Sequence, residues 1–338
     1  MKSIADLAAA GLVAPTAALE RVASRYAVSL SPEIAALAHH GAIARQFLPS
    51  EAELVTRDDE LADPIGDAAH APVPGIVHRH RDRVLFKVVA ACPVYCRFCF
   101  RRETVGQAQN ALSPAAIDTA LAYIAAHPEI WEVILTGGDP FILSARRAAA
   151  LTQDLAAIEH VKIVRWHTRV PVVEPSRVDD AFVAALIAPG ITGIVALHAN
   201  HPAEFTPAAR RAVARLVDDG IPLVSQSVLL KGVNDDVATL EALMRSFVEN
   251  RIKPYYLHHP DRASGTSHFR VSIAQGRAIM RELRMRLSGL ALPAYVLDIP
   301  GGHAKVPLLS EDVEEVAPGQ WRIRDHAGVW HLYDDSQP

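Results

Sequence analysis

The three cysteines of the chain lie in one short stretch, Cys92-Pro93-Val94-Tyr95-Cys96-Arg97-Phe98-Cys99, with the spacing C-x3-C-x2-C. Thiolates are soft ligands that suit iron–sulfur clusters and zinc. Three of them on one loop can hold three irons of a 4Fe-4S cluster and leave the fourth iron open for chemistry. A structural zinc is the competing interpretation, but such sites usually pair two cysteine knuckles, and the sequence has only this one.

A second group of chemically capable residues lies near the end of the chain. Lys305 follows a glycine-rich turn, Pro300-Gly301-Gly302, and Asp298 precedes that turn. Two acids in one pocket could trap a cationic group, whereas a single exposed acid is easily screened. Each residue also has an ordinary structural explanation. A lone lysine is more often a solvated surface side chain, and a lone aspartate is more often a helix cap or a loop residue.

These groups need a scaffold that brings them together, and the sequence from Val84 onward predicts one. Short apolar runs alternate with alanine-rich amphipathic segments, which is typical of strand–helix units in a parallel sheet. Helices are expected to begin at Ser113-Pro114 and at Pro207. Right-handed crossovers then place the carboxyl ends of all strands at one mouth, as in an α/β partial (βα)6 TIM-like barrel. Six strands are expected at Val84–Val89, Glu132–Leu135, Lys162–Trp166, Gly193–Leu197, Pro222–Gln226 and Lys253–Leu257, with a further one at Ala294–Asp298.

The segments on either side of the barrel have a different character. Residues 1–70 are expected to form a helical N-terminal extension without concentrated chemistry, opening with one amphipathic helix capped by Ser3. Residues 71–308 would be the barrel. Residues 309–338 would be a small C-terminal tail, in which Trp321–Arg324 and Val329–Tyr333 form a β-hairpin around Asp325-His326-Ala327-Gly328.

The composition excludes several classes of protein. Hydrophobic residues make up 50% and charged residues 21% of 338 positions, so the chain can bury a core. A net charge of −4 disfavours nucleic acid and anionic lipid as partners, and no apolar run reaches the roughly 18 residues that span a membrane. Three cysteines cannot form a closed disulfide framework, which favours a reducing cytoplasm.

The cysteine loop resembles that of the radical S-adenosylmethionine superfamily, in which the same motif follows the first barrel strand and an aromatic residue, here Phe98, precedes the last cysteine. The resemblance implies that Cys92, Cys96 and Cys99 hold a 4Fe-4S cluster whose open iron binds S-adenosylmethionine. One electron would then cleave S-adenosylmethionine to methionine and a 5'-deoxyadenosyl radical. The turn Gly137-Gly138-Asp139-Pro140 stands where the family has a glycine-rich contact to the methionine moiety, although alone such a turn is weak evidence.

Other segments resemble the lysine 2,3-aminomutase family over most of residues 70–308, in the same order and spacing. This resemblance implies an isomerase that uses pyridoxal phosphate and interconverts L-α-lysine and β-lysine. The radical would remove a hydrogen atom from C3 of lysine, the amino group would migrate from C2 to C3, and a hydrogen atom would return to C2. The segments are Val73-Pro74-Gly75, His78–Leu85, Cys99-Phe100-Arg101-Arg102, Gly137–Pro140, Asn200-His201-Pro202-Ala203-Glu204, Gln226–Asp235 and Pro254-Tyr255-Tyr256.

The same resemblance implies roles for residues around the cofactors. Lys305 would hold pyridoxal phosphate as a Schiff base. Arg79 and Arg83 would bind its phosphate, although His80 replaces a tyrosine that is common in the family. The remaining cofactor contacts would come from Gly137, Gly138, Asp139 and Gln226.

The substrate would be recognised by charge at both ends. Arg101 would pair with the substrate carboxylate, unless it or Arg102 merely balances the charge of the cluster. Asp261 and Asp298 would receive the distal ammonium of lysine. Expected partners are therefore the amino acid and a reductant such as flavodoxin or ferredoxin, and we expect no assembly larger than a homodimer.

Several alternatives stay open at this point. The length resembles a shorter bacterial branch that makes β-lysine for elongation factor P, whereas Asp298 resembles the enzymes that act on free lysine; arginine also stays open as a substrate. A cluster-bearing sensor would need neither Lys305 nor the two aspartates. A metal-binding surface is a further option, but His258 and His259 would point to opposite faces of a strand. That surface would comprise His78, His80, His258 and His259.

Overall fold

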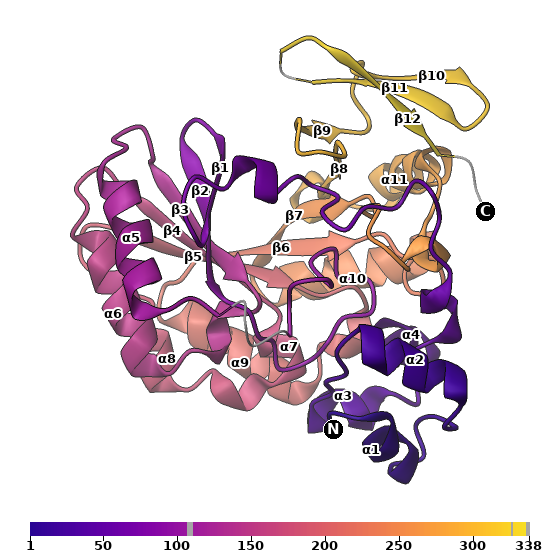
Figure 1. Ribbon diagram of the computed structural model, residues 1–338, viewed down its shortest axis with the longest axis horizontal. Coiled ribbons are helices and arrows are strands. Elements are labelled where there is room, and N and C mark those ends of the chain that lie inside the picture. Colours follow the sequence, from indigo (N-terminus) through magenta and orange to yellow (C-terminus); the bar gives the residue numbers. More distant parts are fainter. Residues whose placement is uncertain (107–110, 326, 336–338) are drawn as a thin grey trace.

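The computed structural model describes residues 1–106, 111–325 and 327–335, and His326 of the expected hairpin turn lies outside this part. The described residues form one curled sheet of nine strands at the centre of the protein (Figure 1). The expected strands are seven parallel neighbours in chain order, which confirms the α/β partial barrel. They are β2 (Arg83–Val89), β3 (Glu132–Gly137), β4 (Ile163–Thr168), β5 (Thr192–His198), β6 (Leu223–Val228), β7 (Ile252–His258) and β8 (Ala294–Asp298).

Two further strands border the parallel ones and were not expected from the sequence. β1 (Ile76–His80) pairs antiparallel with β2 at one edge of the sheet. β9 (Lys305–Pro307) pairs antiparallel with β8 at the other edge. The register of β8 and β9 places Lys305 directly opposite Asp298.

Alternation along the strands separates a core face from a cavity face. Phe86, Leu135, Trp166 and Val195 are neighbours across β2 to β5, and all four are fully buried. Side chains on the opposite face of the sheet, from β3 to β8, line a cavity instead. These include Ile134, Thr136, Arg165, His167, Ala196, His198, Gln226, Val228, His258 and Asp298.

The helices between the strands begin at capped positions. Ser113 and Thr206 each accept a hydrogen bond from the first turn of their helix, so both helices predicted from the sequence begin where expected. Figure 1 shows α5, α6, α8 and α9 along the outer side of the curled sheet. The set comprises α5 (Pro114–Ala125), α6 (Ala145–Ala156), α7 (Val170–Val173), α8 (Asp180–Ala185), α9 (Pro207–Asp218), α10 (Val237–Glu249) and α11 (Ile273–Arg286).

The N-terminal extension contains four short helices and differs from the sequence prediction. Ser3 caps the first helix as expected, but this helix ends at Ala9, and a second begins after the cap Thr16. Gly11 adopts φ of 69°, and it separates the two helices where one was predicted. The elements are α1 (Ile4–Ala9), α2 (Ala17–Arg25), α3 (Pro32–Leu37), α4 (Gly41–Phe47) and the 3-10 helices η1 (Glu51–Leu54) and η2 (Ala68–His70).

The segment before β1 crosses from the last strands of the sheet to the first. Leu61 forms an isolated parallel bridge with Ala263. Pro64 O accepts a hydrogen bond from Gly301 N at 3.0 Å, and Ile65 O accepts one from Arg79 Nη1 at 2.6 Å. The extension therefore links the two edges that the partial barrel leaves apart.

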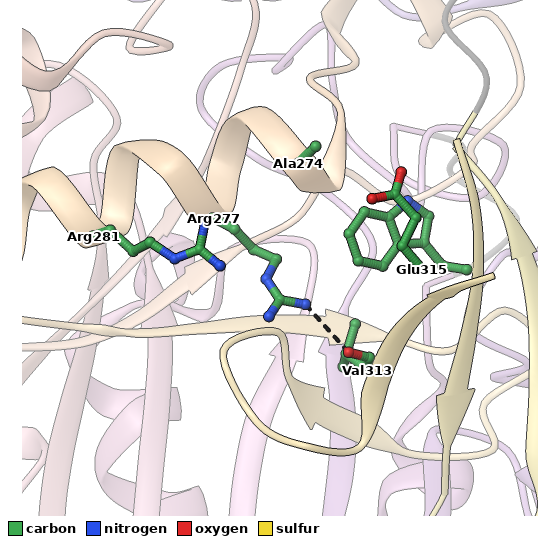
Figure 2. Close-up of a pocket in the computed structure, with 6 residues that line it drawn as sticks. Ala274, Arg277, Arg281, Val313 and Glu315 are labelled. Atoms are coloured by element: carbon green, nitrogen blue, oxygen red, sulfur yellow. Dashed lines mark hydrogen bonds between the residues drawn. The ribbon is translucent and has the colours of Figure 1, made fainter. Parts of the chain in front are cut away.

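A separate three-stranded antiparallel sheet follows β9 and stands apart from the barrel in Figure 1. It contains β10 (Val313–Ala317), which was not expected, and the two strands of the expected hairpin, β11 (Gln320–Arg324) and β12 (Trp330–Asp334). Arg277 of α11 attaches this sheet, because its Nη1 donates to Val313 O at 3.2 Å (Figure 2). Its guanidinium carbon also lies 5.5 Å from the centre of the Trp321 ring. No helix in the described part of the chain has the length and hydropathy that crossing a bilayer requires.

Candidate active site

All of the residues expected to bind the cluster, a cofactor or the substrate line one cavity of about 920 Å³ on the inner face of the curled sheet. That volume lies within the roughly 300–1,000 Å³ typical of small-molecule sites. Both edges of the sheet contribute, so its curvature brings together residues from the first and the last strands. They are Arg79, Arg83, Cys92, Cys96, Cys99, Arg101, Gly137, Gly138, Asp139, Gln226, Asp261, Asp298 and Lys305.

The cysteine loop follows β2 and places all three thiols on the cavity wall. Burial raises the pKa of each thiol, and the charges of Asp139 and the other two cysteines raise that of Cys92 further. Arg169 opposes the shift at Cys96, where its Nη1 donates to Sγ at 3.1 Å. Buried thiols held together in this way become thiolates when a metal binds. The donor set therefore fits a 4Fe-4S cluster.

The glycine turn after β3 lies directly against the backbone that leads into the cysteine loop. A Cβ atom at Gly137 would lie 2.3 Å from Val89 O, and one at Gly138 would lie 2.2 Å from Ala91 O. Asp139 is buried, and its carboxylate accepts hydrogen bonds from Thr168 Oγ1 and Arg169 N, both at 2.7 Å. The turn is therefore glycine-rich because the backbones touch, and Asp139 joins the loops after β3 and β4.

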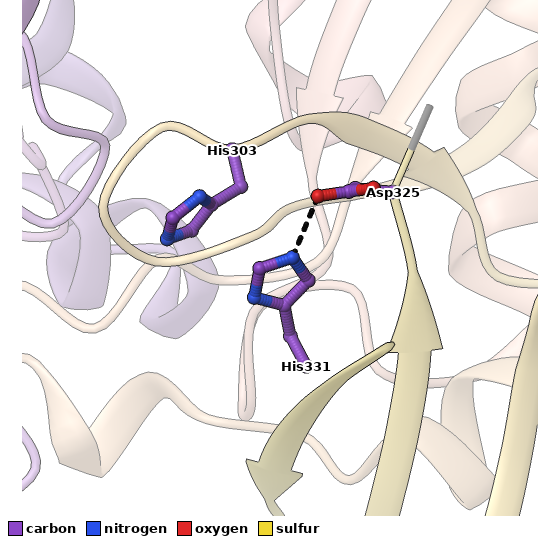
Figure 3. Close-up of side chains that lie close together, drawn as sticks. All are labelled: His303, Asp325 and His331. Carbon is purple, nitrogen blue, oxygen red and sulfur yellow. Dashed lines mark hydrogen bonds and ion pairs between the residues drawn. The ribbon is translucent and has the colours of Figure 1, made fainter. Parts of the chain in front are cut away.

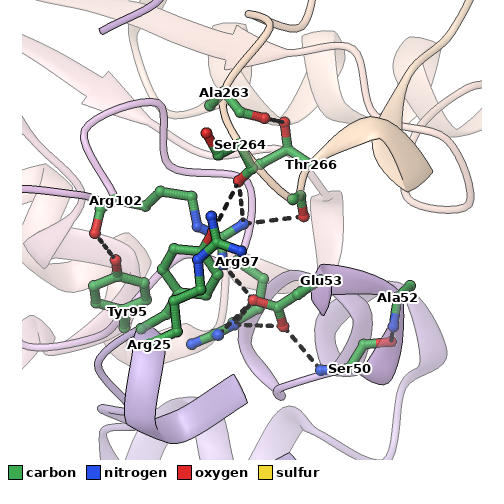
Figure 4. Close-up of polar contacts among 12 residues, drawn as sticks. Arg25, Ser50, Ala52, Glu53, Tyr95, Arg97, Arg102, Ala263, Ser264 and Thr266 are labelled. Atoms are coloured by element: carbon green, nitrogen blue, oxygen red, sulfur yellow. Dashed lines mark hydrogen bonds and ion pairs between the residues drawn. The ribbon is translucent and has the colours of Figure 1, made fainter. Parts of the chain in front are cut away.

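An ion-pair network from the N-terminal extension holds the cysteine loop (Figure 4). Glu53 of η1 is 0% exposed and accepts hydrogen bonds from Arg97 Nε at 2.9 Å and from Arg102 Nη2. Arg102 Nη1 also donates to Gly265 O at 3.1 Å. The extension thus supplies a buried carboxylate that holds the cysteine loop, a structural role that the sequence analysis did not predict. The cap pattern Ser50-x-x-Glu53 is visible in the sequence, but its buried arginine partners are not.

A second network behind the cluster loop involves Arg169, which the sequence analysis missed. Arg169 Nη2 donates to Glu204 Oε2 at 2.7 Å and to Gln46 Oε1 at 2.6 Å. Glu204 also caps the backbone of Asn200 and His201, at 2.9 and 3.0 Å. The segment Asn200–Glu204 was recognised from the sequence, and the structure shows that it orients the arginine that contacts Cys96.

Lys305 and Asp298 form an ion pair across the β8–β9 hairpin. His258 lies beside them, with Nδ1 at 3.4 Å from Lys305 Nζ and 3.7 Å from Asp298 Oδ2. Burial alone would raise the pKa of Asp298, but the charge of Lys305 and then the contact with His258 lower it below its usual range. The glycines before Lys305 have φ of 87° and 81°, so the turn requires Gly301 and Gly302.

Asp261 follows β7 and faces the same charges. Burial and then the negative charge of Asp298 raise the pKa of Asp261 to about 7. Lys305, Arg101 and Arg79 act in the opposite direction. The two aspartates are thus electrostatically coupled, as expected for carboxylates that share one site.

Arginines from β1, β2 and the cluster loop add positive charge to the cavity. Arg79 Nη2 lies 4.0 Å from Asp298 Oδ1, and Arg83 pairs with its neighbour Asp82 at 2.7 Å. Arg101 Nε donates to Asp67 Oδ2 at 2.8 Å. Burial would raise the pKa of Asp67, but Arg101 and other cations lower it. Asp67 was not a candidate in the sequence because nothing in its neighbourhood marks it.

The histidines of the cavity favour their neutral forms. Burial, with Arg83 and Arg79, lowers the pKa of His80 to about 4. Burial also lowers the pKa of His167, His198 and His258. His258 Nε2 is buried without a hydrogen-bond partner among the described residues, so it can serve a ligand. His259 does not line the cavity, and its Nδ1 lies 2.8 Å from Tyr295 Oη, which confirms that the adjacent pair points to opposite sides.

Comparison with known proteins identifies the family to which the chain belongs. The model of the radical SAM superfamily matches residues 86–243. L-lysine 2,3-aminomutase of Fusobacterium nucleatum is 37% identical over 295 residues, which are 87% of this chain and 69% of that protein. L-lysine 2,3-aminomutase of Escherichia coli (strain K12) is 39% identical over 264 residues, 78% of this chain and 77% of that protein. Glutamate 2,3-aminomutase of Clostridioides difficile (strain 630) is 35% identical over 264 residues, 78% of this chain and 62% of that protein.

The regions matched by these relatives extend well beyond the cysteine motif. The relatives are named as enzymes that move an amino group within one molecule. Members of the radical SAM superfamily use a 4Fe-4S cluster and S-adenosylmethionine, which agrees with the three thiols on the cavity wall. The chain belongs to the lysine 2,3-aminomutase family of the radical SAM superfamily and is an isomerase.

Proposed function

We propose that this enzyme is a pyridoxal phosphate-dependent L-lysine 2,3-aminomutase that interconverts L-α-lysine and β-lysine. The observation that carries the proposal is the ion pair between Lys305 and Asp298. This pair supports the proposal because the alkylammonium of Lys305 lies against Asp298 on the wall of the cavity that contains the three thiols. The distal ammonium of a lysine substrate has the same chemistry.

The cofactors would be held by groups that the cavity already presents. Cys92, Cys96 and Cys99 would ligate the cluster, and Lys305 would hold pyridoxal phosphate, with Arg79 and Arg83 as cations for its phosphate. When bound, the cluster with S-adenosylmethionine supplies a radical that removes and returns a hydrogen atom, and pyridoxal phosphate supplies a covalent anchor with electron delocalisation. Gly137, Gly138, Asp139 and Gln226 would shape the surface that the cofactors contact. A low-potential electron donor such as flavodoxin or ferredoxin would serve the cluster.

The chain's own residues would orient the substrate by its charges. Arg101 is held by Asp67 at 2.8 Å and by Thr136 at 3.4 Å, which points its guanidinium into the cavity as a partner for the α-carboxylate. Asp298 and Asp261 would accept the distal ammonium once Lys305 holds the cofactor. Neutral histidines around them avoid repulsion of a cation. A glutamate side chain would instead add a third negative charge, so the aspartate pair favours lysine.

The proposal is tested by an anaerobic assay of reconstituted enzyme with S-adenosylmethionine, pyridoxal phosphate, a reductant and one amino acid at a time. L-lysine, L-arginine and L-glutamate are compared, and products are separated by mass spectrometry against β-amino acid standards. We expect β-lysine from lysine, and turnover at least tenfold slower with the other two. Turnover of glutamate in preference to lysine would refute the assigned substrate.

The role of Lys305 has a readout that does not depend on turnover. Borohydride trapping followed by peptide mass mapping identifies the residue that carries pyridoxal phosphate. We expect the adduct on Lys305 in the native enzyme and none in Lys305→Ala, while the iron content stays the same. An adduct on a different lysine would remove Lys305 from this role.

A further inference from the structure

Three side chains that could ligate a metal meet where the C-terminal sheet faces the turn that leads to Lys305 (Figure 3). His303 belongs to that turn, Asp325 directly follows β11, and His331 lies in β12. One ligand atom from each side chain lies within 4.8 Å of the other two. None of the three lines the cavity with the cysteines, so this cluster is a separate feature among the described residues.

Two of the three donors are already fixed in place. His331 Nε2 lies 2.7 Å from Asp325 Oδ2, while Asp325 Oδ1 accepts hydrogen bonds from Ala327 N and Val329 N, both at 2.9 Å. The turn therefore orients the carboxylate toward the histidines. The His303 ring is tilted by 30° against the His331 ring, with their centroids 4.4 Å apart. His303 is exposed, so its side chain can rotate without disturbing the core.

The donor set indicates the kind of ion. Two imidazoles and one carboxylate suit zinc and other late first-row divalent metals, and they do not suit calcium or magnesium, which prefer oxygen ligands. Zinc–ligand bonds of about 2.0–2.2 Å place tetrahedral ligand atoms roughly 3.3 Å apart. Because no two of the ligand atoms are more than 4.8 Å apart, they need to approach by at most about 1.5 Å, which rotation of His303 can supply. Three protein ligands leave a fourth position for water.

We propose that His303, Asp325 and His331 bind a divalent transition metal ion of the zinc class, which ties the C-terminal sheet to the turn before Lys305. The turn also touches the arginine at the opposite edge of the barrel, because a Cβ atom at Gly302 would lie 3.0 Å from Arg79 Nη1. Bound metal would thus restrain a segment that reaches both Arg79 and Lys305. This restraint affects the cofactor only if Lys305 has the role proposed above. Metal binding by the three side chains does not depend on that role.

The test uses the anaerobic enzyme with its cluster loaded, so that the cysteines are already occupied. Equilibrium dialysis against buffered Zn²⁺, followed by mass-spectrometric metal analysis, measures zinc and iron in the same sample. We expect one zinc ion per chain without loss of iron. His303→Ala and Asp325→Asn should each weaken zinc binding by tenfold or more, whereas His39→Ala, at another exposed histidine, should leave it unchanged. Equal zinc binding by the native enzyme and by His303→Ala, or no zinc in the native enzyme, would overturn the proposal.

Hydrogen exchange tests whether the metal joins the two segments. Zn²⁺ should slow exchange in residues 300–305 and in β12 of the native enzyme by severalfold, and it should have no such effect in His303→Ala. Zinc binding without slower exchange in residues 300–305 would refute the tie. Because His303→Ala changes an exposed turn residue, its iron content and melting temperature should match those of the native enzyme. Neither measurement requires aminomutase turnover, so a failure here is distinguishable from a failure of the proposed function.

Discussion

Replacement of Glu53 by glutamine tests how the N-terminal extension supports the cluster loop. The carboxylate is 0% exposed and pairs with Arg97 and Arg102, each 1% exposed. Glu53→Gln keeps the shape of the side chain but leaves two buried guanidinium groups without their counterion. Removing one partner of a buried ion pair typically costs about 3–5 kcal/mol.

The size of the thermal shift follows from the length of the chain. An unfolding entropy of about 2.1 cal/mol/K per residue gives about 0.7 kcal/mol/K for 338 residues. The cost of about 3–5 kcal/mol therefore lowers the melting temperature by about 4–7 °C. Scanning calorimetry of the anaerobic, cluster-loaded enzyme at a fixed scan rate measures this shift. Because Arg97 directly follows Cys96, we also expect less iron per chain after exposure to a chelator.

Glu51→Gln provides the matched control in the same 3-10 helix. Glu51 is exposed and accepts one hydrogen bond, from Thr16 Oγ1 at 3.0 Å. Exposed substitutions of this kind usually stay within about 0.5 kcal/mol, so its melting temperature should change by less than about 1 °C. If Glu53→Gln melts within 1 °C of this control and keeps its iron equally well, then the network does not hold the loop and the reasoning is wrong.

Three further outcomes are expected. Burial and the charge of Asp298 raise the pKa of Asp261 to about 7, so below this pH its carboxyl becomes neutral and attracts an ammonium less. KM for lysine should therefore rise as the pH falls. Asp261→Asn should raise KM and flatten this dependence, and an unchanged pH profile would count against the residue. Arg169→Lys keeps the charge but removes the guanidinium N–H that donates to Cys96 Sγ. A potentiometric titration followed by electron paramagnetic resonance should then give a more negative cluster potential, whereas an unchanged potential would rule out this contact as a determinant. Gly276→Ala places a Cβ atom 2.0 Å from Tyr295 Oη. Overpacking of this kind typically lowers the free energy of unfolding by about 1–3 kcal/mol, so the melting temperature should fall by about 1–4 °C. Gly289→Ala, whose Cβ meets nothing within 4 Å, should melt like the native enzyme.

The parallel strands were predictable because their apolar runs are buried on at least one face over several residues. β9 was missed because it contains only Lys305, Val306 and Pro307, and its pairing with β8 depends on the turn that precedes it. β10 was missed because its sequence Val-Glu-Glu-Val-Ala has one buried residue and no clear alternation. Short edge strands of this kind are specified by tertiary pairing more than by local pattern.

The residues of the candidate site were also predictable only in part. Residues whose spacing resembled a family motif, such as Cys92 and Lys305, could be named from the sequence, and they line one cavity. Glu53, Asp67 and Arg169 could not be named, because an isolated charged residue does not reveal a partner that is distant in the chain. The sequence showed which groups are chemically capable, whereas the groups that hold them in place became visible only in three dimensions.

The contact between Arg102 and the backbone near Gly265 has a consequence for how the enzyme is made. Arg102 Nη1 donates to Gly265 O at 3.1 Å, and Gly265 N donates to Glu60 at 2.8 Å. At a synthesis rate of about 5–20 residues per second, Gly265 is translated about 8–30 s after Arg102. During that interval the nascent cysteine loop lacks part of its anchorage. Iron delivered before the chain is complete would meet a loop that is not yet fixed, so cluster insertion is expected to follow translation.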